Sequence, residues 1–438
     1  MTSEERSQIR IPGAKPHPGG TSAKPHPGGR GLGGRGLGQP VVWGALTVWT
    51  AVWAWLRWTP SGISWHFFPQ GAHLLFGGSG TAADGLHLYA RHPELQIEPL
   101  TFAVVEPLTW LPAAAALATA QVLMTAAGLL ALWLVAPLAA RDQDSRRDSG
   151  SDSTRTRGPG FRFRFRSGSG EVRVLLAGLV VLPFWTVLSV RWTHPDDVLA
   201  ILLAAAAVRA IHARRGSLAG LALAGAIAAK PWAVGFTPML LALPASALAG
   251  AIAAASIAVA AAWLPFLLAD SGTISALRPP VLIADTSVLR LVGITGQTVP
   301  GWTRTAQFLL APAAALLAVV RGRWAAVPLV AIAVRLALDP QDIGYYTAGA
   351  LIAAALADLA CSDLLLPWAT IGTAVLWWHP FVVDFATRFT TAHGISLWWF
   401  QHPSVVASAH LAWSAAAVAL LFVPETVLRH AEPELSRA

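Results

Sequence analysis

The segment Ala113–Ala139 reads AAAALATAQVLMTAAGLLALWLVAPLA and contains no charged residue. A helix of this length crosses the hydrocarbon core of a bilayer, which needs about 20 consecutive apolar residues. Apolar runs of about 16 to 27 residues recur along all 438 residues of the chain. Charged residues make up only 12% of the sequence and hydrophobic residues 55%, and a soluble protein carries about twice that share of charge. The sequence therefore predicts an all-α, multi-pass membrane protein with about 10–12 transmembrane or re-entrant helices.

The chain has a formal net charge of +8. We attribute this charge to arginine in the cytoplasmic loops of a membrane protein and expect no nucleic-acid partner. Arginine collects in the polar loops and tails between apolar runs, as the positive-inside rule requires of cytoplasmic segments. Cys361 is the only cysteine, so one chain can form neither a disulfide nor a cysteine-based metal site. Many of the 20 tryptophans stand at the ends of apolar runs, where tryptophan anchors a helix at the membrane surface.

The polar segments divide the chain into a membrane domain and two tails. Residues 1–40 repeat AKPHPGG and are too rich in glycine and proline to form a packed core, so we predict a disordered cytoplasmic tail. The Ser-, Arg- and Asp-rich stretch 141–173 predicts a disordered cytoplasmic loop. The membrane domain then spans 41–423, with outer loops 58–100 and 269–305, and a second cytoplasmic tail covers 424–438. We expect the chain in the cytoplasmic membrane, with both termini on the cytoplasmic side.

Two proline-bounded breaks keep the arginine-rich segments on the cytoplasmic side. If Leu100–Leu111 and Ala113–Ala139 both crossed, the arginine-rich loop that follows would lie outside, so the first run is predicted to be a partial or re-entrant helix. By the same rule, Leu218–Ala229 and Trp232–Leu243 are predicted to form a hairpin of half-helices with Lys230 at its tip. Irregular backbone at membrane depth is tolerated only where it is buried or lines a cavity. Both breaks therefore indicate where a substrate pocket lies.

This threading places most of the scarce ionic side chains on one face of the membrane. Charges at the membrane edge are energetically costly and usually functional. Carboxylates beside cations, open to water and to lipid, suit the transfer of a polar group from a lipid phosphate. Arg or Lys would hold the leaving phosphate, and Asp or Glu would accept the proton of the acceptor hydroxyl. The substrate-binding residues that we predict are His194, Asp196, Lys230, Arg290, Asp342 and Tyr345.

Three motifs in a fixed order resemble the GT-C class of membrane glycosyltransferases. Within that class they are most similar to glycosyltransferase family 87, the polyprenyl-phosphate-mannose-dependent, mannosyltransferase-like integral membrane proteins of actinobacteria. The first motif is the loop that carries GAHLLFGG (71–78), then GLHLY (85–89), then Glu98-Pro99-Leu100 at the start of an apolar run. The second is the short His-Pro-Asp-Asp loop (194–197), and the third is AGLALAGAIAAKPW (219–232), a small-residue run that ends in Lys-Pro.

The resemblance extends over Val41–Leu243 and implies a GT-C-like fold and inverting sugar transfer outside the cytoplasmic membrane. The implied donor is a polyprenyl-phosphate sugar, with mannose expected, and the implied acceptor is a lipid or a glycan. In that family the general base is an acidic residue just after the first span. Here that place reads SGISWH (61–66) and holds no acid. Asp84, Glu94 or Glu98 could replace this acid, or His66 could act as the base, and a catalytically altered GT-C-like protein is an alternative. The catalytic residues that we predict are Glu98, Asp197 and His66.

Most of these residues also have a purely structural interpretation. Asp196 or Asp197 is well placed to cap the helix that follows, because Asp is favoured at helix N-termini. Lys230 is a candidate for phosphate binding, but a lysine at a helix break can instead extend to the membrane surface. His66 and Tyr345 lie among aromatic residues at the ends of apolar runs, as interfacial anchors do. The sequence alone leaves these alternatives open.

No metal site is assigned, although a substrate or metal role for Asp196 and Asp197 stays open beside helix capping, and a divalent cation is left open as a cofactor. Arg335 lies within an apolar run and needs a partner there, and Asp339, one turn further along, is the expected one.

A membrane transporter or lipid flippase is the alternative function. Transporters commonly show two matching halves with broken helices at equivalent places. This chain has breaks at Pro107 and Pro231 but no convincing internal repeat, and its charges gather on one side rather than at mid-membrane. Both observations favour the enzyme, whose partners would be a polyprenyl-phosphate sugar donor, a lipid or glycan acceptor, and membrane lipid. The enzyme predicts one outward-facing cavity with a side opening to lipid.

Overall fold

The structure is a computed structural model that describes residues 39–58, 62–77, 83–140, 169–276, 281–362, 364–377, 398–399 and 401–423. Regular structure within these ranges is helical, and the β contact that they contain is an isolated bridge between Leu282 and Thr298. The prediction of an all-α, multi-pass membrane protein is confirmed. The helices long and apolar enough to cross a membrane are Ala113–Ala139, Gly170–Trp192, Ala245–Ala269, Gly301–Val320 and Pro403–Phe422. The predicted tail after residue 423, most of the tail before residue 40 and most of the 141–173 loop lie outside the described residues.

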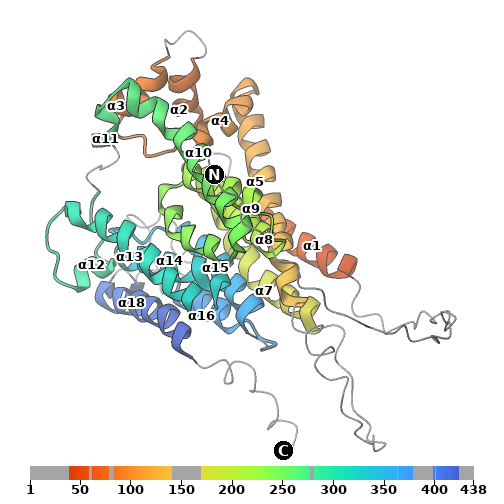
Figure 1. Cartoon of the computed structure of the whole chain (residues 1–438). Helices are drawn as coiled ribbons and strands as arrows, with labels where there is room; N and C mark the ends of the chain where they lie inside the picture. Colours follow the sequence, from red (N-terminus) through yellow and green to blue (C-terminus); the bar gives the residue numbers. More distant parts are fainter. Residues whose placement is uncertain are drawn as a thin grey trace, which may run out of the picture. The chain divides into compact units, whose positions relative to one another are not determined.

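Figure 1 shows how the helices follow one another along the chain. The first half forms α1 (Gln39–Arg57), α2 (Phe67–Phe76), α3 (Leu88–Arg91), α4 (Pro99–Val105), α5 (Ala113–Val135), α7 (Ser169–Thr186), α8 (Pro195–His212), α9 (Gly216–Ala229) and α10 (Ala245–Ala269). The second half forms α11 (Gly272–Ala276), α12 (Val288–Leu291), α13 (Gly301–Val320), α14 (Val327–Ala337), α15 (Tyr346–Cys361), α16 (Trp368–Leu376) and α18 (Pro403–Ala419). Tighter 3₁₀ segments are η1 (Gly85–His87), η2 (Glu106–Trp110), η3 (Ala136–Ala140), η5 (Pro231–Ala242), η6 (Trp324–Ala326) and η8 (Leu420–Phe422), and η4 (Val187–Trp192) is a π-helix.

Both breaks that the sequence indicates are present. α9 ends at Ala229, Lys230 adopts an extended conformation (φ −154°, ψ 114°), and η5 begins at Pro231. A proline disfavours helical backbone at the residue before it, which explains why the helix stops here. The run Leu100–Leu111 lies in the short helices α4 and η2 rather than in one long helix.

Helix ends that are far apart in the sequence meet at one end of the bundle, which we call the cavity end. The start of α8 contacts the break between α9 and η5 there, because the Lys230 ammonium lies 2.6 Å from a carboxylate oxygen of Asp196. Figure 1 shows α2, α3, α4 and α11 gathered near the C-terminal end of α10. At the opposite end, Arg173 of α7 donates hydrogen bonds to carbonyls at the end of α15, and Arg323 donates to carbonyls at the end of α18.

The buried apolar side chains form two clusters. The larger cluster fills the bundle with alanine, leucine and valine, and Trp185 and Trp377 are its largest fully buried side chains. The smaller cluster belongs to the covering segment, by which we mean residues 62–77 and 83–98, and to the helices below it. The covering segment contributes Phe68, Leu88 and Tyr89 to this cluster, and its other side consists of residues from α4, α5 and α10. The covering segment is therefore held on the bundle by apolar packing.

Close contact between α9 and α10 explains the small-residue run before Lys230. Gly216 and Gly220 lie four residues apart on one face of α9. A Cβ atom built on Gly216 would lie 2.1 Å from the backbone oxygen of Ala247, and one built on Gly220 would lie 2.1 Å from that of Ala251. Such small-xxx-small spacing lets helix backbones approach closely in membranes. The position of Lys230, at the end of α9, therefore depends on these two glycines.

Substituting Gly220 by alanine should destabilise the fold, because the added Cβ meets backbone and cannot be accommodated by a side-chain rotation. We expect a loss of about 2–3 kcal/mol, at the upper end of the usual cost of overpacking. Thermal unfolding of the purified protein in detergent measures it. Gly44→Ala is the matched control, since a Cβ on Gly44 of α1 meets nothing within 4 Å. Equal melting temperatures for the two variants would contradict the close α9–α10 contact.

Candidate active site

A cavity of about 720 Å³ opens at the cavity end of the bundle. Its walls come from the covering segment, the turn between η4 and α8, the break at Lys230, the start of α13, the end of α14 and the turn before α15. Polar and ionic side chains that line it are Ser64, Glu94, Gln96, Glu98, His194, Asp196, Lys230, Arg304, Gln307, Arg335, Gln341, Asp342, Tyr345 and Tyr346. The cavity therefore brings together groups that lie up to about 280 residues apart in the chain.

Four ionisable side chains form a tight cluster at this cavity. The Lys230 ammonium lies 2.6 Å from Oδ2 of Asp196 and 3.7 Å from Oδ2 of Asp197. Nδ1 of His194 contacts Oδ1 of Asp196 and lies 3.0 Å from Oδ2 of Asp197. Asp196 is fully buried and Asp197 is 3% exposed. Two buried carboxylates are thus balanced by one ammonium and one imidazole, as buried charges require.

The backbone before His194 is held in an uncommon conformation. Thr193 has φ 51° and ψ 66°, the left-handed region that β-branched residues rarely adopt. The buried Gln121 side chain of α5 donates hydrogen bonds to the carbonyl of Val190 at 2.9 Å and to Oγ1 of Thr193 at 3.4 Å. Gly62 packs against the same threonine, where a Cβ would lie 2.6 Å from Oγ1. These contacts fix the turn that presents His194 to Asp196.

Aromatic rings surround the imidazole and fix its orientation. Tyr345 stacks on His194 with ring centroids 4.1 Å apart, and Phe68 approaches the other side at 5.4 Å, edge to face. Tyr345 also contacts Trp192 and Tyr346. Tyr345 therefore contacts the ionic cluster and lines the cavity, and its two predicted roles, substrate binding or interfacial anchoring, stay predictions.

Glu98 faces the cavity from the end of the covering segment. The residue is 8% exposed, and its Oε2 atom is buried without a hydrogen-bond partner. Burial of the carboxyl, partly offset by the nearby Lys230 ammonium, raises the pKa of Glu98 to about 8. Tyr89 keeps this stretch in place by donating a hydrogen bond to the carbonyl of Ile97 at 2.9 Å. A carboxyl that holds its proton near neutral pH is typical of a group that exchanges protons with a substrate.

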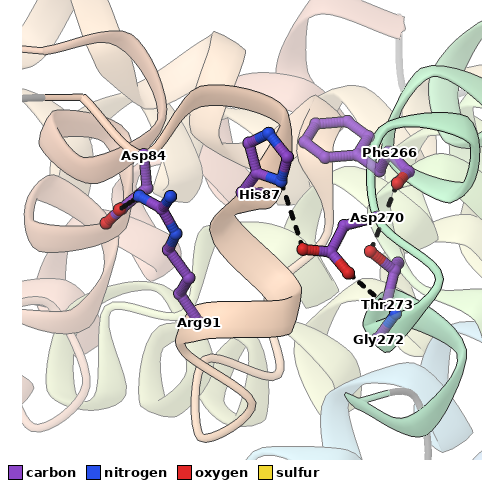
Figure 2. A network of polar contacts seen from close by, with 7 residues as sticks. All are labelled: Asp84, His87, Arg91, Phe266, Asp270, Gly272 and Thr273. Atoms are coloured by element: carbon purple, nitrogen blue, oxygen red, sulfur yellow. Dashed lines mark hydrogen bonds and ion pairs between the residues drawn. The ribbon is translucent and has the colours of Figure 1, made fainter.

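Ionic contacts attach the covering segment to the end of α10 (Figure 2). Nδ1 of His87 lies 3.1 Å from Oδ2 of Asp270, whose other oxygen accepts from the backbone N–H of Gly272 at 2.9 Å. These two donors lower the pKa of Asp270, with the Gly272 N–H contributing most. Within the segment, Arg91 pairs with Asp84 at 2.5 Å and lowers the pKa of that carboxyl in the same way. The covering segment is thus attached to the bundle by the His87–Asp270 contact.

Two arginines also line the cavity. Arg304, in the first turn of α13, donates to Oε1 of Gln307 at 3.1 Å. Arg335, near the end of α14, lies 3.1 Å from Oδ2 of Asp339. The predicted Arg335–Asp339 pair is therefore confirmed.

The structure brings six of the predicted site residues to the cavity wall and leaves three elsewhere. Glu98, His194, Asp196, Lys230, Asp342 and Tyr345 line the cavity. Asp197 lies behind Asp196 and takes part in the ionic cluster, but it is not a lining residue. His66 is exposed at the start of α2 and stacks on Phe67. The roles assigned to all nine residues stay predictions.

Arg290 serves its own loop instead of the cavity. Its guanidinium donates hydrogen bonds to the carbonyls of Ile283, Ile294 and Gly296 at 2.9–3.3 Å. It is absent from the residues that line the cavity in the described part of the chain.

Arg304, Gln307 and Trp232 line the cavity although sequence reasoning did not select them. One available signal was that Arg304 and Gln307 are polar residues one turn apart on the first turns of a membrane-spanning run. Polar residues within such runs are costly and usually functional.

One set of side chains has the spacing of a metal site. Ligand atoms of His194, Asp196 and Asp197 all lie within 4.8 Å of one another. The Lys230 ammonium, however, already lies within ion-pair distance of both carboxylates. A divalent cation would have to displace it, so we assign the positive charge of this cluster to Lys230.

Comparison of the chain with protein-family models and with curated proteins yields no match. The resemblance to family 87 glycosyltransferases is thus carried by the sequence motifs alone. The geometry of the cavity is an independent basis for a functional proposal.

Proposed function

We propose that this chain is an integral membrane glycosyltransferase. It moves a sugar, with mannose expected, from a polyprenyl-phosphate donor to a lipid or glycan acceptor outside the cytoplasmic membrane. The observation that carries the proposal is a buried cluster of carboxylates and cations in a cavity that also has an apolar wall. A lipid-linked sugar has both parts, a polar head for the cluster and a hydrocarbon chain for the apolar wall.

The apolar wall lies among helices that expose much of their surface. Trp263 of α10, Val234 of η5, and Phe308 and Ala311 of α13 line the cavity on this side. Only 11% of the residues in the most apolar part of α10 are buried, and 28% in that of α13. In a membrane these faces meet lipid, because little protein covers them. The wall therefore supports entry of a lipid substrate from the side.

The distribution of arginine supports an extracytoplasmic cavity. Arg209 in the last turn of α8 and Arg321 just after α13 lie at the end of the bundle opposite the cavity. Lys and Arg are enriched in short cytoplasmic loops. By this rule the cavity end faces outward, where a polyprenyl-phosphate donor replaces the nucleotide sugars of the cytoplasm.

The proposed reaction is a displacement at the anomeric carbon of the sugar. The oxygen of an acceptor hydroxyl forms a bond to that carbon, and the bond between the carbon and the phosphate oxygen breaks. The electron pair of the broken bond stays on the phosphate oxygen, so the leaving group is polyprenyl phosphate. The proton of the acceptor hydroxyl passes to a carboxylate. We assign this proton to Glu98, because the residue lines the cavity and its buried Oε2 atom has no hydrogen-bond partner among the described residues.

The ionic cluster would act beside Glu98 as a preorganised electrostatic wall. Asp196 is fully buried at the cavity wall with Lys230 paired to it, so this pair would act on the substrate through its electrostatic field. Fixed charges held in a buried site stabilise a transition state without reorganising. Asp197 and His194 contact this pair and fix its position.

Transfer of labelled sugar tests the proposal. Membranes that contain the wild-type protein and labelled polyprenyl-phosphate mannose should transfer label to endogenous lipid or polymer. Asp196→Asn should reduce that transfer by about 100-fold or more, because it removes the carboxylate charge that is paired with Lys230 beside the proposed base Glu98. Asp285→Asn is the matched control, since that carboxylate is 86% exposed and lies outside the cavity wall. Wild-type membranes without transfer would overturn the proposal.

The transporter alternative has weaker support. Alternating access needs a site that is reachable from both ends of the bundle. A second cavity, beside Cys361 and Arg323 at the opposite end, has a volume of only about 50 Å³.

A further inference from the structure

The two ends of the cavity differ in their charge balance. In the ionic cluster, one ammonium and one imidazole face two carboxylates, and Lys230 lies within 3.7 Å of both. An incoming phosphate would meet Asp196 and Asp197 at the same place and be repelled by them. Lys230 therefore has no charge left for an anionic ligand, and a phosphate must be held elsewhere.

Arg304 is a cation without a carboxylate partner among the described residues. Its guanidinium lines the cavity, and its hydrogen-bond partner is the neutral side-chain oxygen of Gln307, at 3.1 Å. A guanidinium carries five donors, so four remain for a ligand or for water. An uncompensated charge at the edge of a membrane domain is costly to keep, which indicates a ligand.

Arg335 adds a second, rigid guanidinium to the same wall. The residue is 7% exposed, and its planar group lies 4.9 Å from the ring centre of Trp232 and 4.4 Å from that of Tyr346. One terminal nitrogen pairs with Asp339 at 3.1 Å, whereas the buried Nε atom has no hydrogen-bond partner among the residues that the structure describes. A buried donor that lacks a partner costs free energy unless a ligand or water satisfies it.

Gln307 connects the two arginines. Its oxygen accepts from Arg304, and its amide nitrogen donates to the carbonyl of Leu338 at 2.9 Å and to that of Arg335 at 3.4 Å. The first turns of α13 and the end of α14 are thereby held together. Gln307 thus holds the Arg304 guanidinium beside the backbone at the end of α14, and both arginines line the cavity.

We propose that Arg304 and Arg335 form a subsite for a phosphate group, separate from the ionic cluster at Lys230. Guanidinium groups match the geometry of phosphate oxygens with paired hydrogen bonds, and stacking on aromatic rings holds the fork in position. That the phosphate belongs to the sugar donor rests on the proposed function, but the binding of phosphate does not. The sugar then lies between the subsite and Glu98, beside Trp232 and Tyr345.

Binding measurements on the full-length protein in a neutral detergent test this subsite. The probes are farnesyl phosphate, inorganic phosphate and the uncharged alcohol farnesol, titrated by calorimetry. Wild type should bind farnesyl phosphate and discriminate against farnesol. Arg304→Gln should weaken farnesyl phosphate binding by about tenfold or more, as expected for loss of a charge-assisted hydrogen bond. Arg335→Lys keeps the positive charge and its pairing with Asp339 but removes the planar guanidinium with its paired donors. It should also weaken binding.

Arg321→Gln is the matched control, because Arg321 lies at the opposite end of the bundle over the ring of Phe422. It should leave affinity unchanged. Arginine-dependent binding of farnesyl phosphate alone supports a lipid phosphate, and arginine-dependent binding of inorganic phosphate as well supports a site for the free anion. Wild-type affinity in both Arg304→Gln and Arg335→Lys would overturn the subsite, as would no phosphate binding by wild type. If binding depends on Arg304 but wild-type membranes transfer no sugar, the subsite stands and the proposed function fails.

Discussion

The Lys230→Met variant is expected to be less stable than the wild type by about 3–5 kcal/mol. Methionine keeps the length and apolar volume of the lysine side chain but removes its ammonium. Asp196, which is fully buried, then loses a partner at 2.6 Å, and Asp197 loses one at 3.7 Å. Removing one member of a buried ion pair leaves an uncompensated charge, which is far more destabilising than losing the pair as a whole. Unfolding in mixed detergent micelles, followed by circular dichroism, measures the change.

Two further variants separate charge from packing. Lys230→Arg keeps the positive charge and should lose much less stability than Lys230→Met. Adding Asp196→Asn to Lys230→Met removes the orphaned carboxylate and should restore part of the lost stability, so that the two effects are not additive. If Lys230→Met were as stable as wild type, the ammonium would not be what neutralises this cluster.

The Glu98→Gln variant is expected to lose sugar transfer by about 100-fold to 10,000-fold, the usual contribution of a general base. The pKa of Glu98 is raised to about 8, so the carboxyl is largely protonated at pH 6.5 and largely ionised at pH 9. A base must be ionised to accept a proton, so wild-type transfer should increase roughly 25-fold as the pH rises from 6.5 to 8.5. In the folded protein this proton is held up to about pH 8, whereas the unfolded chain releases it near the ordinary value of 4.5. Stability linked to Glu98 is therefore greatest below pH 4.5 and decreases as the pH approaches 8.

Initial transfer rates between pH 6 and 9 test the Glu98 assignment. The glutamine variant should lose the increase with pH as well as the rate. Glu106→Gln is the control, because Glu106 lies in η2, outside the cavity wall, and pairs with Trp110 and Thr109. A glutamine variant that keeps a rising pH profile would assign the base to another group.

The sequence predicts those features that depend on the cost of a charge in lipid. An apolar run of spanning length has few alternatives, so the membrane fold followed from composition and periodicity. The proline at 231 disfavours helical backbone at Lys230, so a helix was expected to end there. Keeping the arginine-rich loops cytoplasmic then put Lys230 on the same face of the membrane as Asp196, in the first turn of α8. The contact between them is the physical consequence of that threading.

The direction of individual side chains was harder to predict. Arg290 and Arg304 both lie in the predicted outer loop 269–305, and the one local difference is that Arg304 is followed one turn later by Gln307 at the start of an apolar run. The structure uses Arg290 to hold carbonyls of its own loop, whereas Arg304 begins a helix and faces the cavity. His66 also looked like a catalytic side chain, but the start of α2 leaves it exposed beside Phe67. Such outcomes depend on tertiary register, which local sequence does not determine.

The separate apolar cluster under the covering segment has an evolutionary consequence. Because this segment closes on its own hydrophobic residues and is fastened to α10 by the His87–Asp270 pair, its outer surface can diverge while the rods beneath stay unchanged. For the proposed glycosyltransferase, selection for a different acceptor would then act mainly on the cavity-lining residues between Glu94 and Glu98. Enzymes related in this way would share a donor and differ in the acceptor that they extend.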